Sequence, residues 1–149
     1  MNKTEVIHKE ILQKVLNVVS KWPDDWPSRD EVYLKIKRWG NFVTAETVDY
    51  AVRHFVLSGP SYKKLDARMR KRLLRAARMS SSTKAVLLSI KEGSKTPTMI
   101  IIRANKLLRK IDPEADKIHQ YSYNRHLSIL AKLAEGDKEV GEILKKLKS

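Results

Sequence analysis

Apolar residues recur along most of this chain at intervals of three and four, the spacing of one face of an α-helix. In residues 4–21, Ile11, Val15 and Val19 belong to such a series, and polar residues lie between them. The same pattern predicts helices at 29–38, 45–57, 65–79, 83–92, 97–110, 123–134 and 138–147. No β-hairpin signal is found, although the apolar run at 99–102 is also compatible with a buried strand. We therefore expect a mainly α fold.

Residues that favour helix ends separate these segments. Two prolines in 22–27 end the first helix, because proline fixes φ and removes a backbone donor. Ser28 precedes Glu31 by three residues, which predicts a capping box at the start of the second helix. Thr96 is followed by a proline, a typical N-cap and first helical position. Two further N-caps are predicted at Thr44 and Ser122.

The predicted helices fall into two halves with a similar order. Residues 1–61 hold a long helix followed by two shorter ones, and residues 80–149 again hold three successive helices, the first of them short, and add a C-terminal helix. Between them, residues 62–79 form a basic amphipathic helix, and the serines at 80–82 break the helical pattern as a hinge would. We expect two helix-turn-helix-like three-helix units bridged by the basic helix.

Charge narrows the choice of partner. The 149 residues include 31 Lys and Arg against 17 Asp and Glu, a net charge of +14. So large a surplus is usually retained because the partner is a polyanion, such as DNA, RNA or an anionic membrane. No segment reaches the roughly 20 apolar residues that span a bilayer, and the first residues lack a signal peptide. We expect a cytoplasmic protein whose partner is DNA or RNA and not a membrane.

The strongest local feature is the basic side of the helix at 65–79. On a helical wheel its cations gather opposite Leu65, Met69 and Leu73, and Asp66 is the only acid between residues 61 and 80. An unbalanced row of cations favours phosphate contact, although a solvated face whose stems cover apolar surface is the alternative. The predicted phosphate ligands are Lys63, Lys64, Arg68, Lys71, Arg72, Arg75 and Arg78.

Three segments of the second half, 84–90, 96–97 and 122–130, resemble the winged helix-turn-helix superfamily of archaeal regulators and of the C-terminal domains of archaeal replication initiators. The resemblance implies a DNA-binding domain in which 123–134 is the recognition helix. It would place Tyr123, Asn124, Arg125 and Ser128 at DNA. By the same helix order, the first half would offer Thr44, Thr47 and Arg53. The alternative is that these are ordinary exposed polar residues.

Catalytic chemistry has little support in the sequence. Cysteine is absent, the 4 histidines show no metal-ligand spacing, and the 5 glycines do not cluster into a phosphate-binding loop. The pair Asp24 and Asp25 lies between prolines and reads as a turn. We expect no catalytic residues, no metal and no cofactor.

The sequence therefore favours a non-enzymatic protein that binds double-stranded DNA as a regulator or replication-associated factor. A first alternative is an accessory subunit of a larger nucleic-acid machine, in which a protein partner or a second copy docks on the C-terminal helix. Its apolar stripe is Val140, Ile143, Leu144 and Leu147. A second alternative is an RNA or single-strand binder that stacks bases on Tyr62, Tyr121 and Tyr123.

Overall fold

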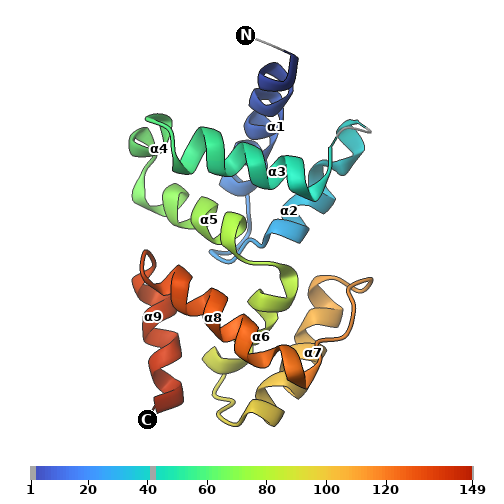
Figure 1. Cartoon of the computed structure of the whole chain (residues 1–149), viewed down its shortest axis with the longest axis vertical. Coiled ribbons are helices and arrows are strands. Elements are labelled where there is room, and N and C mark those ends of the chain that lie inside the picture. The colour runs from blue at the N-terminus through green and yellow to red at the C-terminus, as the bar shows by residue number, and fades with distance from the viewer. Residues whose placement is uncertain (1–2, 41–42, 149) are drawn as a thin grey trace. The chain divides into compact units, whose positions relative to one another are not determined.

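The computed structural model describes residues 3–40 and 43–148, and this part of the chain contains helices and no strand (Figure 1). The chain divides into two compact units, Met1–Arg78 and Met79–Ser149. The mainly α prediction is confirmed, and the apolar run at 99–102 lies within a helix instead of a strand. The boundary between the units falls directly after the basic helix, which belongs to the first unit.

The first unit is arranged around its long N-terminal helix. Its elements are α1 (Lys3–Ser20), α2 (Arg29–Ile36), α3 (Ala45–Ala51), α4 (Ser61–Lys64) and α5 (Ala67–Arg78). A 3-10 turn, η1 (Lys37–Trp39), extends α2, and a π-helical turn, η2 (Val52–Leu57), extends α3. Helix α1 packs against α2, α3 and α5. The core is formed by Ile11, Val15, Val19, Val32, Ile36, Val43, Val48, Ala51, Val52, Leu73, Ala76 and Ala77.

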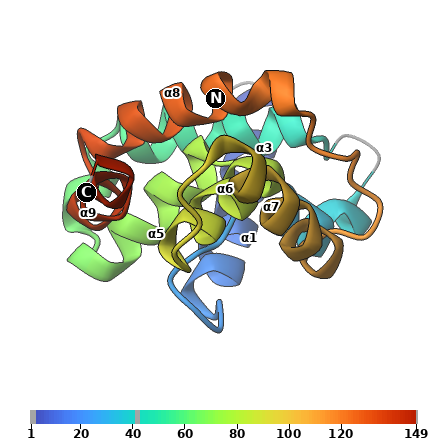
Figure 2. The same ribbon diagram turned by 90° about the horizontal axis from the view of Figure 1, so that it is seen from below.

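The second unit is arranged around α6. Its elements are α6 (Ser81–Lys91), α7 (Pro97–Ile111), η3 (Gln120–Ser122), α8 (Tyr123–Ala134), α9 (Lys138–Lys145) and η4 (Lys146–Lys148). Helix α6 contacts α7, α8 and α9, and Figure 2 shows α6 and α7 side by side. Its buried apolar residues include Val86, Leu87, Ile90, Ile100, Ala104, Leu108, Leu130, Leu133, Val140 and Ile143.

Most of the predicted helix ends are confirmed. Ser28 and Glu31 form the capping box of α2, and Thr44 and Thr96 cap α3 and α7. Gly93, after α6, has φ +108°, a left-handed conformation that glycine adopts without steric cost. Most α-helices of the structure therefore begin and end where the sequence indicates.

The prediction for Ser122 is right about the position and wrong about the capping bond. A cap residue normally has an extended backbone so that its oxygen can face the first amides of the helix. Ser122 instead has φ −88° and ψ −2°, because it is the last residue of the turn η3. Its hydroxyl donates to the carbonyl oxygen of His119 at 2.8 Å. Helix α8 therefore starts without a side-chain cap.

The basic helix is shorter than predicted. Leu65 is extended, with ψ 150°, and the carboxylate of Asp66 accepts a hydrogen bond from the backbone N–H of Met69 at 2.8 Å. Helix α5 consequently begins at Ala67, and Lys64 lies in the separate turn α4. The single row of cations drawn on one helical wheel is therefore divided between two elements.

The order of the helices matches the helix-turn-helix template, but the lengths of the connections and the element after α8 do not. A short helix-turn-helix joins its helices by about three to four residues, whereas residues 37–44 connect α2 to α3 and residues 112–122 connect α7 to α8. In the winged family a β-hairpin follows the recognition helix, but here α9 follows α8, and no strand occurs in the described residues. The wing implied by the resemblance is therefore not present in this part of the chain.

Candidate nucleic-acid interface

Two arginines of the basic helix lie inside the first unit. Arg72 is 5% exposed and Arg75 is 0% exposed. Burying a guanidinium is costly unless its N–H groups find acceptors. Arg72 donates from Nη1 to the carbonyl oxygens of Val19 and Ser20, at 3.1 and 3.4 Å. These two carbonyls lie at the C-terminal end of α1, where a helix leaves its last carbonyls without intrahelical donors.

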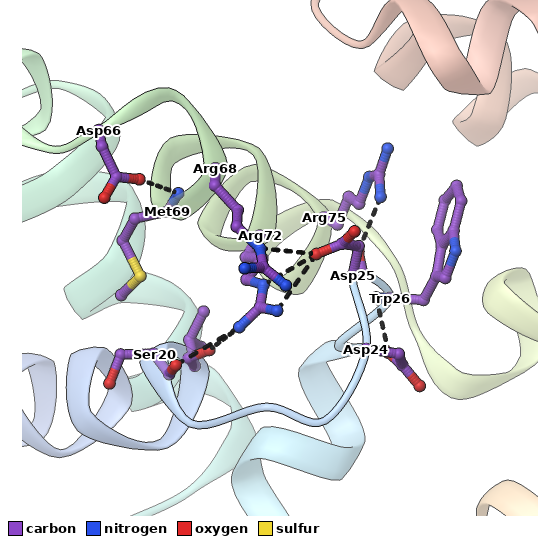
Figure 3. A network of polar contacts seen from close by, with 10 residues as sticks. Ser20, Asp24, Asp25, Trp26, Asp66, Arg68, Met69, Arg72 and Arg75 are labelled. Carbon is purple, nitrogen blue, oxygen red and sulfur yellow. Dashed lines mark hydrogen bonds and ion pairs between the residues drawn. The ribbon is translucent and has the colours of Figure 1, made fainter.

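Arg75 is held by the loop that follows α1. Its Nη1 donates to the backbone carbonyl oxygen of Asp25 at 2.7 Å, and its Cζ lies 3.7 Å from the centroid of the Trp26 ring. Asp25 and Trp26, the two partners, are neighbours in the same loop, and Figure 3 shows the hydrogen bond of Arg75 to this loop. The loop between the two prolines is therefore fixed on α5 by a charge-assisted hydrogen bond and a cation–π contact.

The carboxylate of Asp25 lies between two guanidinium groups. Its Oδ1 is 3.2 Å from Nε of Arg68 and 3.2 Å from Nη2 of Arg72 (Figure 3). The hydrogen bond from Arg68, followed by that from Arg72, holds the pKa of Asp25 below its ordinary value, although burial opposes the shift. Asp25 thus supplies the negative charge that α5 lacks.

These contacts correct the predicted role of the basic helix. Arg72 and Arg75 were expected on phosphates, but their buried position leaves no room for a nucleic-acid backbone. The wheel considered only acids on the same helix, and Asp25 precedes Arg72 by 47 residues. The sequence signal that could have indicated this contact is an acidic residue, Asp25, held between two prolines in a strongly basic chain. Asp24, its neighbour, accepts from the backbone N–H of Trp26 at 2.7 Å and shapes the turn.

The remaining predicted phosphate ligands differ in their access to solvent. The side chains of Lys63, Lys64 and Lys71 are exposed. Arg68 is also exposed, with 71% of its side chain accessible, although it pairs with Asp25. Arg78 is half-buried, and its Nε has no hydrogen-bond partner among the described residues. The first unit therefore offers mainly lysines to a polyanion.

The three predicted contact residues of α3 and η2 are engaged locally. Thr47 Oγ1 accepts from the Thr44 backbone N–H at 2.8 Å, and Thr44 Oγ1 accepts from the Thr47 N–H at 3.1 Å. Arg53 pairs with Asp49 at 3.0 Å, four residues earlier. Thr44 and Thr47 thus serve to start the helix, and Arg53 is an exposed side chain with its own carboxylate partner.

Helix α8 presents its predicted polar residues to solvent, but its buried side is His126, Leu130 and Leu133 and not the predicted stripe of Leu127, Leu130, Ala131 and Ala134, of which Ala131 is exposed. Asn124, Arg125 and Ser128 are exposed, whereas Leu130 and Leu133 on the other side are buried. The side chains of Asn124 and Arg125 make no hydrogen bond or ion pair within the described part of the chain. Both are therefore available to a ligand in solution.

Two further residues of this helix are less available to a ligand, one because its hydroxyl is already bonded and one because it is half-buried. Ser128 donates its hydroxyl to the backbone carbonyl of Asn124 at 3.0 Å. Tyr123 is half-buried, and burial raises the pKa of its phenol. Of the four residues predicted to lie at DNA, Asn124 and Arg125 thus have the most freedom to contact it.

A buried histidine fixes α8 on the second unit. His126 is 4% exposed, and its Nδ1 lies 3.0 Å from Oγ1 of the fully buried Thr83 on α6. Burial, with a smaller contribution from the charge of Arg125, lowers the pKa of His126. The imidazole is therefore neutral near pH 7, and it orients the helix that carries the exposed residues.

The start of α8 differs from the other helix starts. Side-chain oxygens cap α2, α3, α5, α6, α7 and α9, through Ser28, Thr44, Asp66, Ser80, Thr96 and Asp137. In the described residues, α8 is the one helix of eight residues or more for which no side-chain cap is found, α1 being left aside. The turn η3 leads directly into α8 instead, and the backbone N–H of Tyr123 donates to the carbonyl oxygen of Gln120.

An aromatic pair precedes α8. The rings of His119 and Tyr121 stack with their centroids 5.2 Å apart and their planes 6° apart. Tyr121 is 83% exposed. Tyr62, in contrast, packs against the core of the first unit. Of the three tyrosines considered for base stacking, Tyr121 is the one that faces solvent.

The predicted docking stripe on the C-terminal helix is divided. Val140 and Ile143 are buried in the second unit itself, at 0% and 4% exposure. Leu144 and Leu147 are half-buried and line, together with Leu127, an open groove of about 410 Å³ between α8 and α9. Two of the four residues predicted for a partner therefore belong to the core.

No group of three or more His, Asp or Glu side chains that could hold a metal ion is found among the described residues. In the same part of the chain, no helix is long and apolar enough to cross a membrane. No protein-family model, curated protein or solved structure matches this chain. The proposals below therefore depend on the geometry and charge of the chain itself.

Proposed function

We propose that this protein binds double-stranded DNA without catalysing a reaction, and that it acts as a regulator or a replication-associated factor. In this proposal α6, α7 and α8 form a helix-turn-helix-like unit without a wing. The first turns of α8 enter the major groove, as the recognition helix does in that class of protein. The observation that carries the proposal is the exposed, unpaired Asn124 and Arg125 at the uncapped start of a rigidly held helix.

The chemistry of these side chains suits a duplex. An arginine can donate two hydrogen bonds to guanine O6 and N7, and an asparagine can bond adenine N6 and N7. His126 and Leu130 are buried and hold α8 in the second unit. The backbone that carries Asn124 and Arg125 therefore does not have to become ordered on binding.

The net charge supports phosphate contact from both units. Residues 1–78 contain 17 Lys and Arg against 9 Asp and Glu, and residues 79–149 contain 14 against 8. Exposed lysines, among them Lys63, Lys64 and Lys71, are suited to contact phosphates without reading sequence. Such contacts release counterions, so the affinity is expected to fall steeply with salt.

A matched pair of variants tests the proposal. Arg125→Ala and Lys132→Ala each remove one exposed cation from α8, the first at its start and the second in its last turn. For a duplex selected from a random pool, we expect Arg125→Ala to weaken binding by about 1–3 kcal/mol and to relax the preference at one base pair. Lys132→Ala should change affinity little. Fluorescence anisotropy titrations at two salt concentrations measure both.

The same titrations define the contradicting result. If Arg125→Ala and Asn124→Ala bind the selected duplex as tightly as the unaltered protein, α8 is not the recognition helix. If the unaltered protein shows no affinity for any duplex, the proposal of double-stranded DNA as the ligand is wrong. Circular dichroism controls for folding, because both residues are exposed and neither change should alter the helical signal.

A further inference from the structure

Tyr121 is an aromatic ring held in solvent on an anchored turn. It is 83% exposed, whereas the next most exposed large apolar side chains among the residues whose burial the structure describes, Tyr50 and Met99, reach 48%. One of its faces is supported by the parallel ring of His119. Because a flat ring stacked on one side offers its other face to a second flat group, this pair has the form of a stacking platform.

The backbone beneath the platform is fixed at two points. The side-chain amide of Asn105, on α7, accepts from the backbone N–H of Ile118 at 2.7 Å and donates to the carbonyl oxygen of the same residue at 3.0 Å. Ile118 itself is buried. On the other side of the pair, Ser122 is buried and bonds the carbonyl oxygen of His119 through both its hydroxyl and its backbone N–H. The platform is therefore preorganised, which lowers the entropic cost of stacking a ligand on it.

The surroundings of the platform are cationic and polar. Lys117 precedes the pair and is exposed, and Asn124 and Arg125 follow it in the first turn of α8. A nucleotide combines a flat base with a phosphate, so aromatic and cationic side chains close together are the usual means of holding an unpaired one. The bases inside a duplex are covered by their neighbours and cannot stack on a protein ring without leaving the helix.

We propose that His119 and Tyr121 stack on one unpaired base next to the duplex that α8 contacts. The ligand class is then a duplex with a single-stranded extension, such as the end or edge of an opened region. This inference rests on the proposed function, since it takes as ligand the duplex that the protein is proposed to bind.

The experiment compares three labelled ligands in anisotropy titrations: a blunt duplex, the same duplex with a short single-stranded extension, and the extension strand alone. We expect the extended duplex to bind about 5- to 150-fold more tightly than the blunt one, the range that one stacked base contributes. Tyr121→Ala should remove this preference and leave blunt-duplex binding unchanged. Tyr121→Phe should retain it, because stacking needs the ring and not the hydroxyl.

Tyr50→Ala is the matched control. Tyr50 is also an exposed, stacked tyrosine, but it lies in the first unit against the rings of His8 and His54. The Tyr50→Ala variant should therefore retain the preference for the extended duplex. In addition, 2-aminopurine placed at the first unpaired position should lose fluorescence on binding, and Tyr121→Ala should restore that fluorescence.

The results that overturn the platform are distinct from those that overturn α8. Equal binding of blunt and extended duplexes, or an equal loss for both in Tyr121→Ala, overturns the platform. Loss of the preference in Tyr121→Phe also overturns it, since a hydrogen bond would then explain the effect. If the preference depends on Tyr121 while Arg125→Ala and Asn124→Ala leave blunt-duplex binding unchanged, the platform stands and the proposed role of α8 fails.

Discussion

In the first unit, Arg72 and Arg75 on α5 donate hydrogen bonds to backbone carbonyl oxygens of residues 19–25. In the second unit, Arg125 on α8 is exposed to solvent. Both helices belong to units with a similar surplus of basic residues. The helix with the denser row of arginines is thus the one that uses them to hold its own unit together. The lesson is that charge density on a wheel does not identify an interface until the partners of each guanidinium are known.

The largest expected effect is the loss of stability on replacing Arg75. Arg75→Ala removes a buried donor, leaves the carbonyl oxygen of Asp25 without it, and opens a cavity beside Trp26. We expect the free energy of unfolding of the first unit to fall by about 3 kcal/mol. Tryptophan emission in a urea titration measures this unit selectively, because all 3 tryptophans of the chain lie within residues 1–78.

Arg78→Ala is the control for Arg75→Ala on the same helix. Arg78 is half-buried, and its Nε lacks a hydrogen-bond partner among the described residues, so its removal should cost less than about 1 kcal/mol. Equal destabilisation by the two changes would mean that the contacts of Arg75 with the loop do not stabilise the unit.

Acid should affect the second unit through His126. Burial lowers the pKa of this imidazole below its ordinary value of 6.5, so the unfolded chain takes up the proton first. The contribution of His126 to the free energy of unfolding is therefore fully present above about pH 6.5, and it decreases as the pH falls towards the pKa of the folded state. Circular dichroism in urea at several pH values, compared with tryptophan emission, separates the two units.

His126→Gln sharpens this test, because glutamine stays uncharged over the same range. We expect the variant to be less stable at neutral pH, since the contact with Thr83 is altered, and to show a flatter dependence on pH. An unchanged pH dependence in His126→Gln would show that other groups cause the loss of stability.

The smallest expected effect concerns Asp25. Asp25→Asn removes the charge between the exposed Arg68 and the buried Arg72 but keeps a side-chain oxygen that can accept from both, so it should lower stability by about 1 kcal/mol. It also releases Arg68, and one additional phosphate contact would steepen the slope of log K against log salt by about 0.9. The first unit would then resemble the second in presenting an unpaired arginine to solvent.

Asp24→Asn is the matched control for this change. It alters the net charge by the same amount, but Asp24 bonds the backbone of Trp26 and no arginine. The salt slope of this variant should stay close to that of the unaltered protein. A steeper slope in both variants would assign the effect to net charge and not to the release of Arg68.

The sequence alone predicted those features of the fold that depend on residues close together in the chain. The helices, the caps at Ser28 and Thr96, and the exposed polar side of α8 follow from local spacing, and the structure agrees. The buried side of α8 was predicted correctly only at Leu130. The bonds of Arg72 and Arg75 were missed because their partners lie about 50 residues away, outside any helical wheel. The His119–Tyr121 stack was missed because it requires a turn whose geometry depends on Asn105, in another helix.

The double hydrogen bond between Asn105 and Ile118 divides the long connection after α7 into two parts with different tolerance to change. Residues 112–117 lie before the anchored point and are largely exposed, so a few inserted residues should be accommodated there. Residues 118–122 lie after it, and an insertion among them would displace the aromatic pair from α8. Protein engineering could therefore place a tag or a label in the first part while keeping the second in register.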